Sequence, residues 1–441
     1  MNFIILLITK PIQFLLKKLN RGTSLPGSIA YSLNKNIFAY FKLPKITICI
    51  TGTTGKTSIA STLAATYEQA GLKVGYNPKG SNLLYGILSS LIDSSKLNGK
   101  SKVDALIMEV DERYVKNIFK FFHPKYFVIS NLSRDQLARN GHADDVFEEI
   151  NNSITDDMHL VLNVDDPLVN KFSLKHKGKI TFYGLAKTST STKGNMNALD
   201  VAYCPICHHK LNFNYFNYGN LGDYACPNGD FKRTKPNYEA KMIDDFHFKL
   251  DNNIIKMDND AIYRVYNLTA CYVVGKLTNI NSDTIISSFN SLSLKVKRLS
   301  TFKLDNINGV LLLSKNESPI SYNQSLLYIK KYSEPKTIVI GFNNISGRYN
   351  LKDLSWLYDI NFELLNDDSV KKIICVGKFA CDLIVRLKCA GINTNKIITC
   401  FNSNDMLNVI KAKSIGKVYC MLYFDTEKML KKMLIKEGAD L

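Results

Sequence analysis

A short phosphate-binding loop behind a buried strand constrains this 441-residue chain more than any other feature of its sequence. The loop is Thr51-Gly52-Thr53-Thr54-Gly55-Lys56-Thr57, with two residues between its glycines where the commonest form has four. It follows the run Ile46-Thr47-Ile48-Cys49-Ile50, whose apolar β-branched residues predict a strand, and residues 58–65 predict a helix. A strand, a glycine-rich turn and a helix in this order are typical of domains that bind nucleoside triphosphates.

The residue types of the loop also fit phosphate binding. Gly52 and Gly55 let the backbone curl so that several N–H groups point at one phosphate chain, at the positive end of the following helix. Lys56 can reach the β- and γ-phosphates, and the Thr57 hydroxyl is placed to bind Mg²⁺. Gly-Lys-Thr in this context disfavours the alternative of a purely structural turn. The predicted nucleotide-binding residues of this segment are Gly52, Thr53, Thr54, Gly55, Lys56, Thr57 and Ser58.

A group of carboxylates ends a later strand. Residues 103–108 are mostly apolar, and Glu109-Val110-Asp111-Glu112 follows them directly. In an open α/β sheet, ligands bind beyond the carboxyl ends of the strands, and hard cations take oxygen ligands. We therefore predict that Glu109 shares Mg²⁺ with Thr57. The alternative role, capping of a helix, fits Asp111 and Glu112 better than Glu109.

The order of elements predicts two α/β domains. From residue 45 to about 184, strands alternate with helices, which implies a doubly wound, mostly parallel sheet. A second β/α pattern begins beyond residue 298 and predicts a Rossmann-like domain without a phosphate loop, so its task is substrate or partner contact. We thus expect an N-terminal segment at 1–44, a central ATP-binding domain at 45–297 and a C-terminal domain at 298–441.

A cysteine-containing insertion at 200–236 interrupts the central domain. Cys204-Pro205-Ile206-Cys207 is the first half of a zinc ribbon, and Cys226 stands where the second half is expected. Gly229 occupies the place of the fourth ligand. Two interpretations stay open, a zinc site completed by another residue and a ribbon that has lost its metal. The candidate replacements for the fourth ligand are His208, His209 and Asp230.

The N-terminal segment is apolar and basic. The chain has a formal net charge of +18, and no Asp or Glu precedes Glu68. Such a basic end favours nucleic acid, anionic lipid or phosphorylated substrates, or is simply a solvated surface. The apolar run within residues 2–19 is too short to span a membrane, and no small-residue cleavage site follows it to suggest a signal peptide. They predict an amphipathic helix, packed on the body of the protein or lying on a membrane surface.

The other cysteines argue for a reducing compartment. Seven of them stand mostly inside apolar runs, which predicts buried thiols and a cytoplasmic protein. These residues are Cys49, Cys271, Cys375, Cys381, Cys389, Cys400 and Cys420.

Taken together, these motifs resemble the Mur ligases, over nearly the whole chain. The resemblance is strongest to the branch of that family that works with a glutaminase subunit. Asn131-Leu132-Ser133-Arg134-Asp135-Gln136-Leu137 is the most specific string, because other Mur ligases carry His where Gln136 stands. The further motifs, in order, are Arg21 to Gly27, Thr51 to Thr57, Asn77 to Gly86, Glu109 to Glu112, Phe231 to Arg233, Tyr266-Asn267 and Asp353 to Asp359.

The resemblance implies an activity and roles for particular residues. The activity is ATP-dependent amidation of the D-glutamate α-carboxylate in the lipid II stem peptide. The chain would act in a heterodimer with a glutaminase subunit, and nucleic acid is not an expected partner. Lys56, Thr57 and Glu109 would act on the phosphates and Mg²⁺. Asn267 would lie at the adenosine. Arg298 corresponds to the arginine at the start of the family's C-terminal domain, although Lys297 replaces the Gly that usually precedes it.

The same resemblance implies that an Asp of this chain completes the catalytic triad of the partner glutaminase. Asp353 matches that position, Asp359 is the alternative, and a plain surface role beside Trp356 is equally open. A carboxylate that supports the His of a Cys-His pair is chemically sensible.

Several residues depart from the family pattern. Gly229 replaces a zinc-binding Cys, Ala138 replaces an Asp, and Asn140-Gly141-His142 differs from the usual aromatic-Gly-acid. No lysine matches the carbamylated residue of other Mur ligases. Two rival functions follow, an amino-acid-adding or folylpolyglutamate-synthase-like ligase without a glutaminase, and a nucleotide-binding structural subunit.

Overall fold

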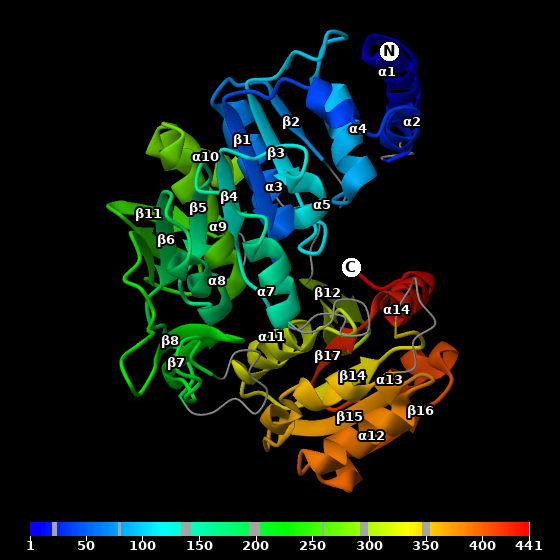
Figure 1. The fold of residues 1–441 in the computed structure, drawn as a ribbon. Helices are drawn as coiled ribbons and strands as arrows, with labels where there is room; N and C mark the ends of the chain where they lie inside the picture. The colour runs from blue at the N-terminus through cyan, green and yellow to red at the C-terminus, as the bar shows by residue number, and fades with distance from the viewer. Residues whose placement is uncertain are drawn as a thin grey trace. The chain divides into compact units, whose positions relative to one another are not determined.

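A computed structural model describes residues 1–19, 24–77, 81–133, 143–193, 203–257, 260–291, 299–345 and 353–440. Arg298, Gln136 and Ala138, together with residues 21–23, 78–80 and 140–142 of the predicted motifs, lie outside these described residues. The chain divides into two compact units, one up to residue 291 and one from residue 299 (Figure 1).

The first unit is built on a nine-stranded sheet with the order β11-β10-β9-β6-β5-β4-β1-β3-β2. Neighbours from β2 to β9 pair in parallel, whereas β9, β10 and β11 pair antiparallel. This antiparallel extension was not predicted from the sequence. The strands are β1 (Ile46–Thr51), β2 (Val74–Tyr76), β3 (Ala105–Glu109), β4 (Tyr126–Ile129), β5 (His159–Asn163), β6 (Ile180–Leu185), β9 (Tyr238–Met242), β10 (His247–Leu250) and β11 (Asn253–Lys256).

Helices cover both faces of this sheet because successive side chains of a strand point to opposite sides. Cys49, Leu106, Met108 and Phe127 belong to one buried apolar cluster with residues of α1, α2, α4, α5, α7 and α8. The helices α3, α9 and α10 pack together elsewhere on the unit. The helices are α1 (Asn2–Lys18), α2 (Leu25–Leu33), α3 (Lys56–Gln69), α4 (Leu84–Ser94), α5 (Val115–Phe119), α7 (Ala143–Asn151), α8 (Pro167–Lys171), α9 (Ile262–Leu277) and α10 (Ser282–Ser291).

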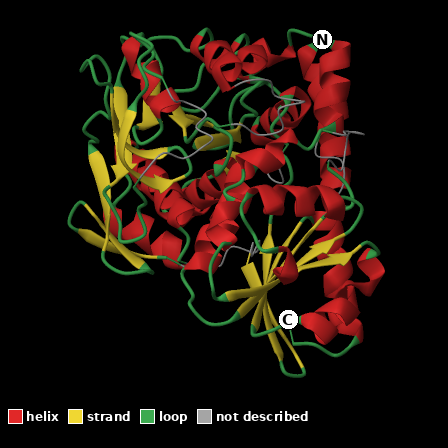
Figure 2. Ribbon diagram, turned by 90° about the horizontal axis from the view of Figure 1, so that it is seen from below, coloured by secondary structure: helices red, strands yellow, loops and turns green. Residues whose placement is uncertain are grey.

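The cysteine-containing insertion forms a small module of its own within the first unit. Its two strands, β7 (Asn212–Tyr218) and β8 (Leu221–Ala225), pair antiparallel and are separate from the large sheet (Figure 2). Cys204, Cys226, Leu211, Tyr224 and Phe231 form its buried apolar cluster.

The second unit has a six-stranded sheet with the order β12-β13-β17-β14-β15-β16, parallel except for the β12–β13 pair. Two apolar clusters fill the spaces on its two faces. Its elements are β12 (Leu299–Leu304), β13 (Ile307–Leu313), α11 (Pro319–Lys330), β14 (Lys336–Gly341), β15 (Val370–Val376), α12 (Ala380–Cys389), β16 (Ile397–Cys400), α13 (Met406–Lys413), β17 (Lys417–Leu422) and α14 (Phe424–Lys436). The predicted fold class, two α/β units with mostly parallel sheets, is confirmed.

Two further predictions from the sequence concern the cysteines and membrane-spanning helices. All ten cysteines are free, but Cys381 and Cys389 are exposed on α12 and do not have the buried positions that we predicted. Both stand on the solvent side of an amphipathic helix, which their apolar sequence neighbours concealed. None of the helices in the described ranges has the length and apolarity to cross a lipid bilayer.

Candidate active site

The phosphate loop joins β1 to α3, with both glycines in backbone conformations that other residues rarely adopt. Gly52 has φ +135° and Gly55 has φ +89°. A Cβ at Gly52 would lie 2.2 Å from Ser130 Oγ, and a Cβ at Gly55 would lie 2.5 Å from Asn267 Oδ1. Both positions therefore require glycine. The first N–H groups of α3 have no partner within the helix and form an anion-binding end behind this loop.

Lys56 lies at the centre of the loop and forms a buried ion pair. Its Nζ is 2.8 Å from Glu112 Oε2 and also donates to the carbonyl oxygens of Gly52 and Thr53. Burial lowers the pKa of Lys56, but the negative charges of Glu112, Glu109 and Asp111 outweigh this effect and hold it above its ordinary value. Lys56 is therefore a charged group among acids.

Thr57 and Glu109 also meet. The Thr57 hydroxyl donates to Glu109 Oε2 over 2.7 Å, and the Asn82 amide donates to Glu109 Oε1 over 3.2 Å. Asn77 holds the backbone of Glu109 from both sides, accepting from its N–H and donating to its C=O, each at 2.7 Å. The two predicted Mg²⁺ ligands thus come together at the carboxyl ends of neighbouring strands, where a hard cation finds two oxygen donors.

Residues that follow β4 fix the shape of the loop. The Asn131 side chain accepts from the N–H of Thr54 and donates to its C=O, both over 3.0 Å. The Thr53 N–H donates to Asn131 O, and the Ser133 N–H donates to Thr53 Oγ1. Thr53 and Thr54 are therefore positioned by this segment.

Helix α9 brings two buried residues to the other side of the loop. Asn267, which is only 5% exposed, lies against Gly55, and Arg264 donates from Nη1 to Ser58 Oγ over 3.3 Å. All seven residues predicted from the loop segment, together with Glu109 and Asn267, thus lie in one place in the structure.

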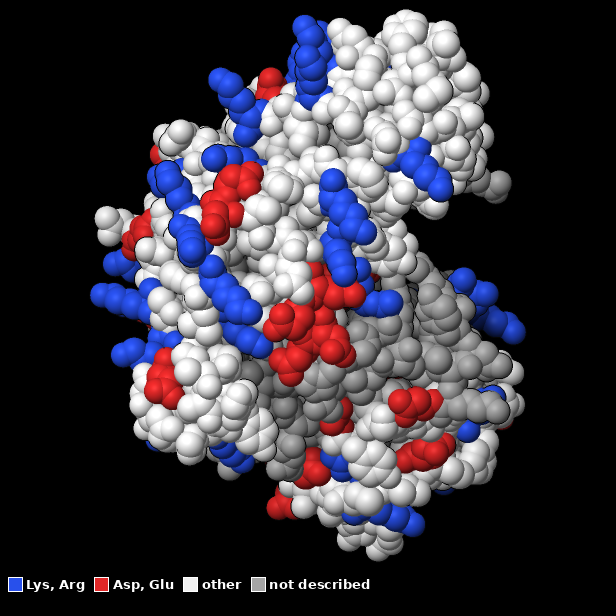
Figure 3. Space-filling view, viewed as in Figure 1, with Lys and Arg blue, Asp and Glu red and all other residues white. Residues whose placement is uncertain are grey.

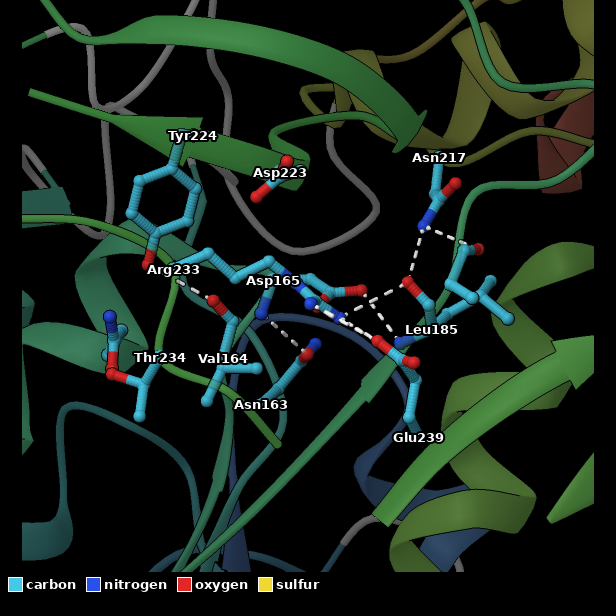
Figure 4. A network of polar contacts seen from close by, with 12 residues as sticks. Asn163, Val164, Asp165, Leu185, Asn217, Asp223, Tyr224, Arg233, Thr234 and Glu239 are labelled. Atoms are coloured by element: carbon cyan, nitrogen blue, oxygen red, sulfur yellow. Dashed lines mark hydrogen bonds and ion pairs between the residues drawn. The ribbon is translucent and has the colours of Figure 1, made fainter. Parts of the chain in front are cut away.

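A network of buried polar side chains attaches the cysteine-containing module to the large sheet (Figure 4). Arg233 Nε donates to Asp165 Oδ1 over 2.7 Å, and the hydroxyl of Tyr266 donates to Asp165 Oδ2 over 2.6 Å. Leu185 N–H donates to the same Oδ2, and Arg233 reaches Glu239 on its far side. Burial lowers the pKa of Arg233, but the Asp165 charge outweighs this effect and raises that pKa. Burial raises the pKa of Asp165, and the Arg233 charge and the hydrogen bond from Tyr266 oppose this rise.

The cysteine module holds a candidate metal centre. The ligand atoms of Cys204, Cys207, Cys226 and Asp230 all lie within 4.8 Å of one another. Cys207 Sγ and Cys226 Sγ are 3.3 Å apart, and Asn228 donates to Cys207 Sγ. Three thiolates and one carboxylate are a donor set that Zn²⁺ accepts. The structure brings Asp230 into the group, and Asn228 rather than the metal-ligand group is the hydrogen-bond partner of His209.

The two Asp candidates for the partner's triad lie in the second unit, around the short 3₁₀ helix at Ser355–Asp359. Asp353 is exposed, and its Oδ1 accepts from the Ser355 N–H over 2.8 Å. Asp359 is half-buried, and its backbone C=O accepts from Asn323. An exposed carboxylate with a fixed backbone contact is open to another chain.

Sequence reasoning missed four residues of the site. Glu112 was interpreted as a capping acid although it pairs with Lys56, and Arg264, Asp165 and Asn82 were given no role. The signal for Asp165 was present, since it follows a strand in the same way as Glu109 does.

Two family models match the chain. The Mur ligase middle domain matches residues 50–222, and the MurT ligase C-terminal domain matches residues 313–425. The subunit MurT of lipid II isoglutaminyl synthase (glutamine-hydrolyzing) from Staphylococcus aureus (strain COL) is 30% identical over 386 residues, 86% of this chain and 85% of that protein. The MurT subunit from Streptococcus pneumoniae (strain ATCC BAA-255 / R6) is 24% identical, over 97% of this chain and 96% of that protein.

Solved structures show the same fold at low identity. A pseudomurein peptide ligase type C from Methanothermus fervidus superposes with a TM-score of 0.70 at 20% identity, covering 91% of this chain and 81% of that one. The MurF ligase from Thermotoga maritima, solved in complex with ADP, gives a TM-score of 0.59 at 15% identity, covering 92% and 84%.

Proposed function

This chain belongs to the MurT family of Mur ligases, and on that premise we propose that it amidates the D-glutamate α-carboxylate of the lipid II stem peptide to D-isoglutamine, using ATP. The observation that carries the proposal is the meeting of Lys56 and Thr57 with Glu109 and Glu112 at one loop. A ligase needs such a site because it must handle triphosphate and metal together.

The reaction divides into two steps. A carboxylate is a poor electrophile, so one of its oxygens first attacks the γ-phosphorus of ATP, which forms an acyl phosphate and releases ADP. Ammonia then attacks the acyl carbon and gives up one proton, phosphate leaves with the electrons of the broken C–O bond and takes up that proton, and the carboxamide remains. Positioning and charge stabilisation supply most of the catalysis in phosphoryl transfer.

The residues of the loop fit the first step. Lys56 is charged and stands where the β- and γ-phosphates would lie, and the N-terminus of α3 donates N–H groups to them. Thr57 and Glu109 would hold Mg²⁺, which when bound neutralises charge on the transferring phosphoryl group. Asn267 beside Gly55 would contact the nucleotide, and we assign Arg298 to the same task from the family pattern.

A glutaminase partner would supply the ammonia of the second step. Free ammonia is mostly protonated at neutral pH, so delivery through a protein protects the nucleophile. We assign Asp353 to the triad of that partner, with Asp359 as the alternative, because Asp353 is exposed in a unit without a phosphate loop. The relatives are subunits by name, which supports a heterodimer.

The remaining assignments follow from the same premise. Cys204, Cys207, Cys226 and Asp230 would hold a structural Zn²⁺. A central domain at 45–297 and a C-terminal domain at 298–441 would carry the ATP site and the partner contact. A lipid-linked substrate that is used together with ATP would place the protein in the cytoplasm, at the inner face of the plasma membrane.

ADP release tests the proposal against its rivals. The purified chain should release ADP over many turnovers only when lipid II and a nitrogen source, ammonium or the glutaminase with glutamine, are both present, because without ammonia the reaction stops at the acyl phosphate. ADP release that needs a free amino acid would favour an amino-acid-adding ligase. ADP release under no condition would leave a nucleotide-binding structural subunit.

A further inference from the structure

Helix α1 is apolar on two opposite sides. Ile5, Leu6 and Thr9 are buried against the rest of the first unit, where α1 packs on α2 and α4. The opposite side, which we call the outer face, carries six large apolar residues that are each between 48% and 59% exposed. They are Phe3, Ile4, Leu7, Ile8, Phe14 and Leu15.

Polar contacts hold the helix in this orientation. Lys10 Nζ donates to the carbonyl oxygens of Ile92 and Ser95 at the end of α4. Lys17 Nζ is 2.6 Å from Asp93 Oδ2, and the Asn34 amide donates to Asn2 Oδ1 over 2.7 Å. Rotation of α1 that buried the outer face would break these contacts along the whole helix. The outer face is therefore a fixed part of the surface.

The outer face is a continuous stripe. Phe3, Leu7 and Phe14 are separated by four and seven residues, a spacing that keeps side chains on one side of an α-helix. Figure 3 shows the surface around α1 and α2 as mostly white, with blue lysine side chains at its edges. A fixed apolar stripe of this length is more than scattered surface residues and marks an interaction site.

The charges around the stripe are basic. Lys17 and Lys18 stand at the end of α1; Lys17 pairs with Asp93, whereas Lys18 Nζ lies 4.8 Å from the centre of the Phe14 ring. Lys35 is exposed and follows Asn34, which bonds to the start of the helix. No Asp or Glu precedes Glu68 in the sequence. Lysines thus stand at both ends of the stripe, and acids are absent from its own sequence.

This pattern selects the partner. A nucleic acid would gain nothing from six apolar side chains, and a second copy of the chain would bring the same lysines face to face. An anionic lipid surface satisfies both features at once, because apolar side chains enter the boundary between headgroups and acyl chains while lysines meet lipid phosphates.

We propose that the outer face of α1 docks on an anionic lipid bilayer and lies in its interface, parallel to the membrane plane. The inference deepens the proposed location at a membrane and rests on that part of the proposed function alone. It assigns the contact to one helix, which then keeps the phosphate loop of the same unit beside a lipid-linked substrate.

Vesicle flotation with the full chain tests the inference. The probe vesicles contain phosphatidylglycerol and phosphatidylcholine, with phosphatidylcholine alone as the neutral comparison, and neither ATP nor lipid II is present. The outer-face variant is Phe3→Ser, Leu7→Ser and Phe14→Ser. The matched control removes three equally exposed apolar residues of the second unit, Phe401→Ser, Phe424→Ser and Ile435→Ser.

We expect the wild type and the control to float with anionic vesicles, with the affinity of the outer-face variant lower by at least about tenfold. Wild-type binding should weaken as salt is raised. Because the altered residues are exposed, all three proteins should melt at the same temperature. Equal flotation of the outer-face variant and the wild type would overturn the inference, as would absence of wild-type flotation.

Two further measurements distinguish lipid docking from a dimer interface and from the proposed amidation activity. Sedimentation that shows a wild-type dimer, dissociated by the outer-face substitutions, would assign the face to a second copy and overturn the lipid proposal. Amidation of detergent-solubilised lipid II should be unchanged in the outer-face variant. If that activity is absent in the wild type, the proposed function fails while vesicle binding still decides the role of α1.

Discussion

Lys56 Nζ lies 2.8 Å from Glu112 Oε2, and both side chains are buried, with exposed fractions of 12% and 7%. The lysine that should hold the phosphates of ATP is thus paired with a carboxylate that follows β3 in the chain. We predict that ATP takes the place of Glu112 at Lys56, so that Glu112 influences how readily the loop accepts a nucleotide.

Replacement of Lys56 by Ala should abolish ATP hydrolysis and amidation. The charge of Lys56 acts on the transferring phosphoryl group, and loss of one such group commonly costs at least about a hundredfold in rate. ADP release and product formation measure the effect. The variant should retain its fold by circular dichroism, because the lost contacts are polar and local. Near-normal amidation would contradict the assignment of the loop.

Replacement of Glu112 by Gln should tighten ATP binding at neutral pH and make it more sensitive to high pH. The variant leaves Lys56 without its main partner, so the phosphates of ATP gain a group that no longer has to be displaced. Isothermal calorimetry at pH 7 and pH 10 measures both effects.

The sign of the pH effect follows from the pKa of Lys56. In the wild type that pKa is raised above 10.5, so the ammonium persists to pH 10 and ATP affinity is steady. Without Glu112, burial lowers the pKa, so affinity falls as pH rises. Asp111→Asn is the control, because Asp111 contributes the smallest of the acidic charges. Identical profiles for all three proteins would contradict the account.

Replacement of Asp165 by Asn should destabilise the first unit by about 3–5 kcal/mol, the usual cost of removing one partner of a buried ion pair. Arg233 would stay largely buried, with only the partly exposed Glu239 left to compensate its charge. Urea unfolding measures the loss. Glu239→Gln is the control, since Glu239 pairs with the same guanidinium but is 32% exposed, and it should cost at most about 1 kcal/mol. Equal losses of unfolding free energy in the two variants would contradict a special role for Asp165 in stabilising the unit.

Replacement of Asp230 by Ala should lower the zinc content of the purified protein and speed its loss to a chelator. Three thiolates and a carboxylate close the site, and removal of the carboxylate leaves an open position. Elemental analysis measures the metal. His208→Ala, a change next to the site, should retain zinc. If His208→Ala loses the metal and Asp230→Ala keeps it, the fourth ligand is His208.

Replacement of Asp353 by Asn, in complex with the glutaminase, should impair amidation driven by glutamine and spare amidation driven by ammonium. Loss of the charge that supports a triad His can cost up to about 10⁴ in rate, whereas free ammonia bypasses that step. The ratio of the two rates on one protein is the measurement, with Asp359→Asn as the matched variant. Equal loss with both nitrogen sources would move Asp353 to the synthetase site or to simple stability.

The sequence predicted local chemistry well because the phosphate loop is continuous in the chain. The spacing of the glycines, Lys56 and Thr57 alone predicts a phosphate-binding loop. Glu109 could be assigned to the same site because it ends a strand. Glu112 and Arg264 could not be found this way. Their roles depend on side chains that meet Lys56 and Ser58 across the fold, and no spacing rule connects residues so far apart.

The same limit explains the differences in the fold. Buried parallel strands are continuous apolar runs and were predicted. The strand β10 alternates polar and apolar residues, β11 holds only two apolar residues between polar ones, and both were missed. The sequence left three candidates for the fourth metal ligand. In the structure, the turn around Gly229, which has φ +78°, brings the Asp230 carboxylate close to the thiols.

The mass of the product tests the central claim most directly. Lipid II is incubated with the purified chain, its glutaminase, ATP and glutamine labelled with ¹⁵N at the amide, and the stem peptide is analysed by mass spectrometry. We expect one carboxyl, that of the D-glutamate, to become a ¹⁵N-carboxamide, only when ATP is present and not with Lys56→Ala. An added amino acid, a label elsewhere, or amidation without ATP would contradict it.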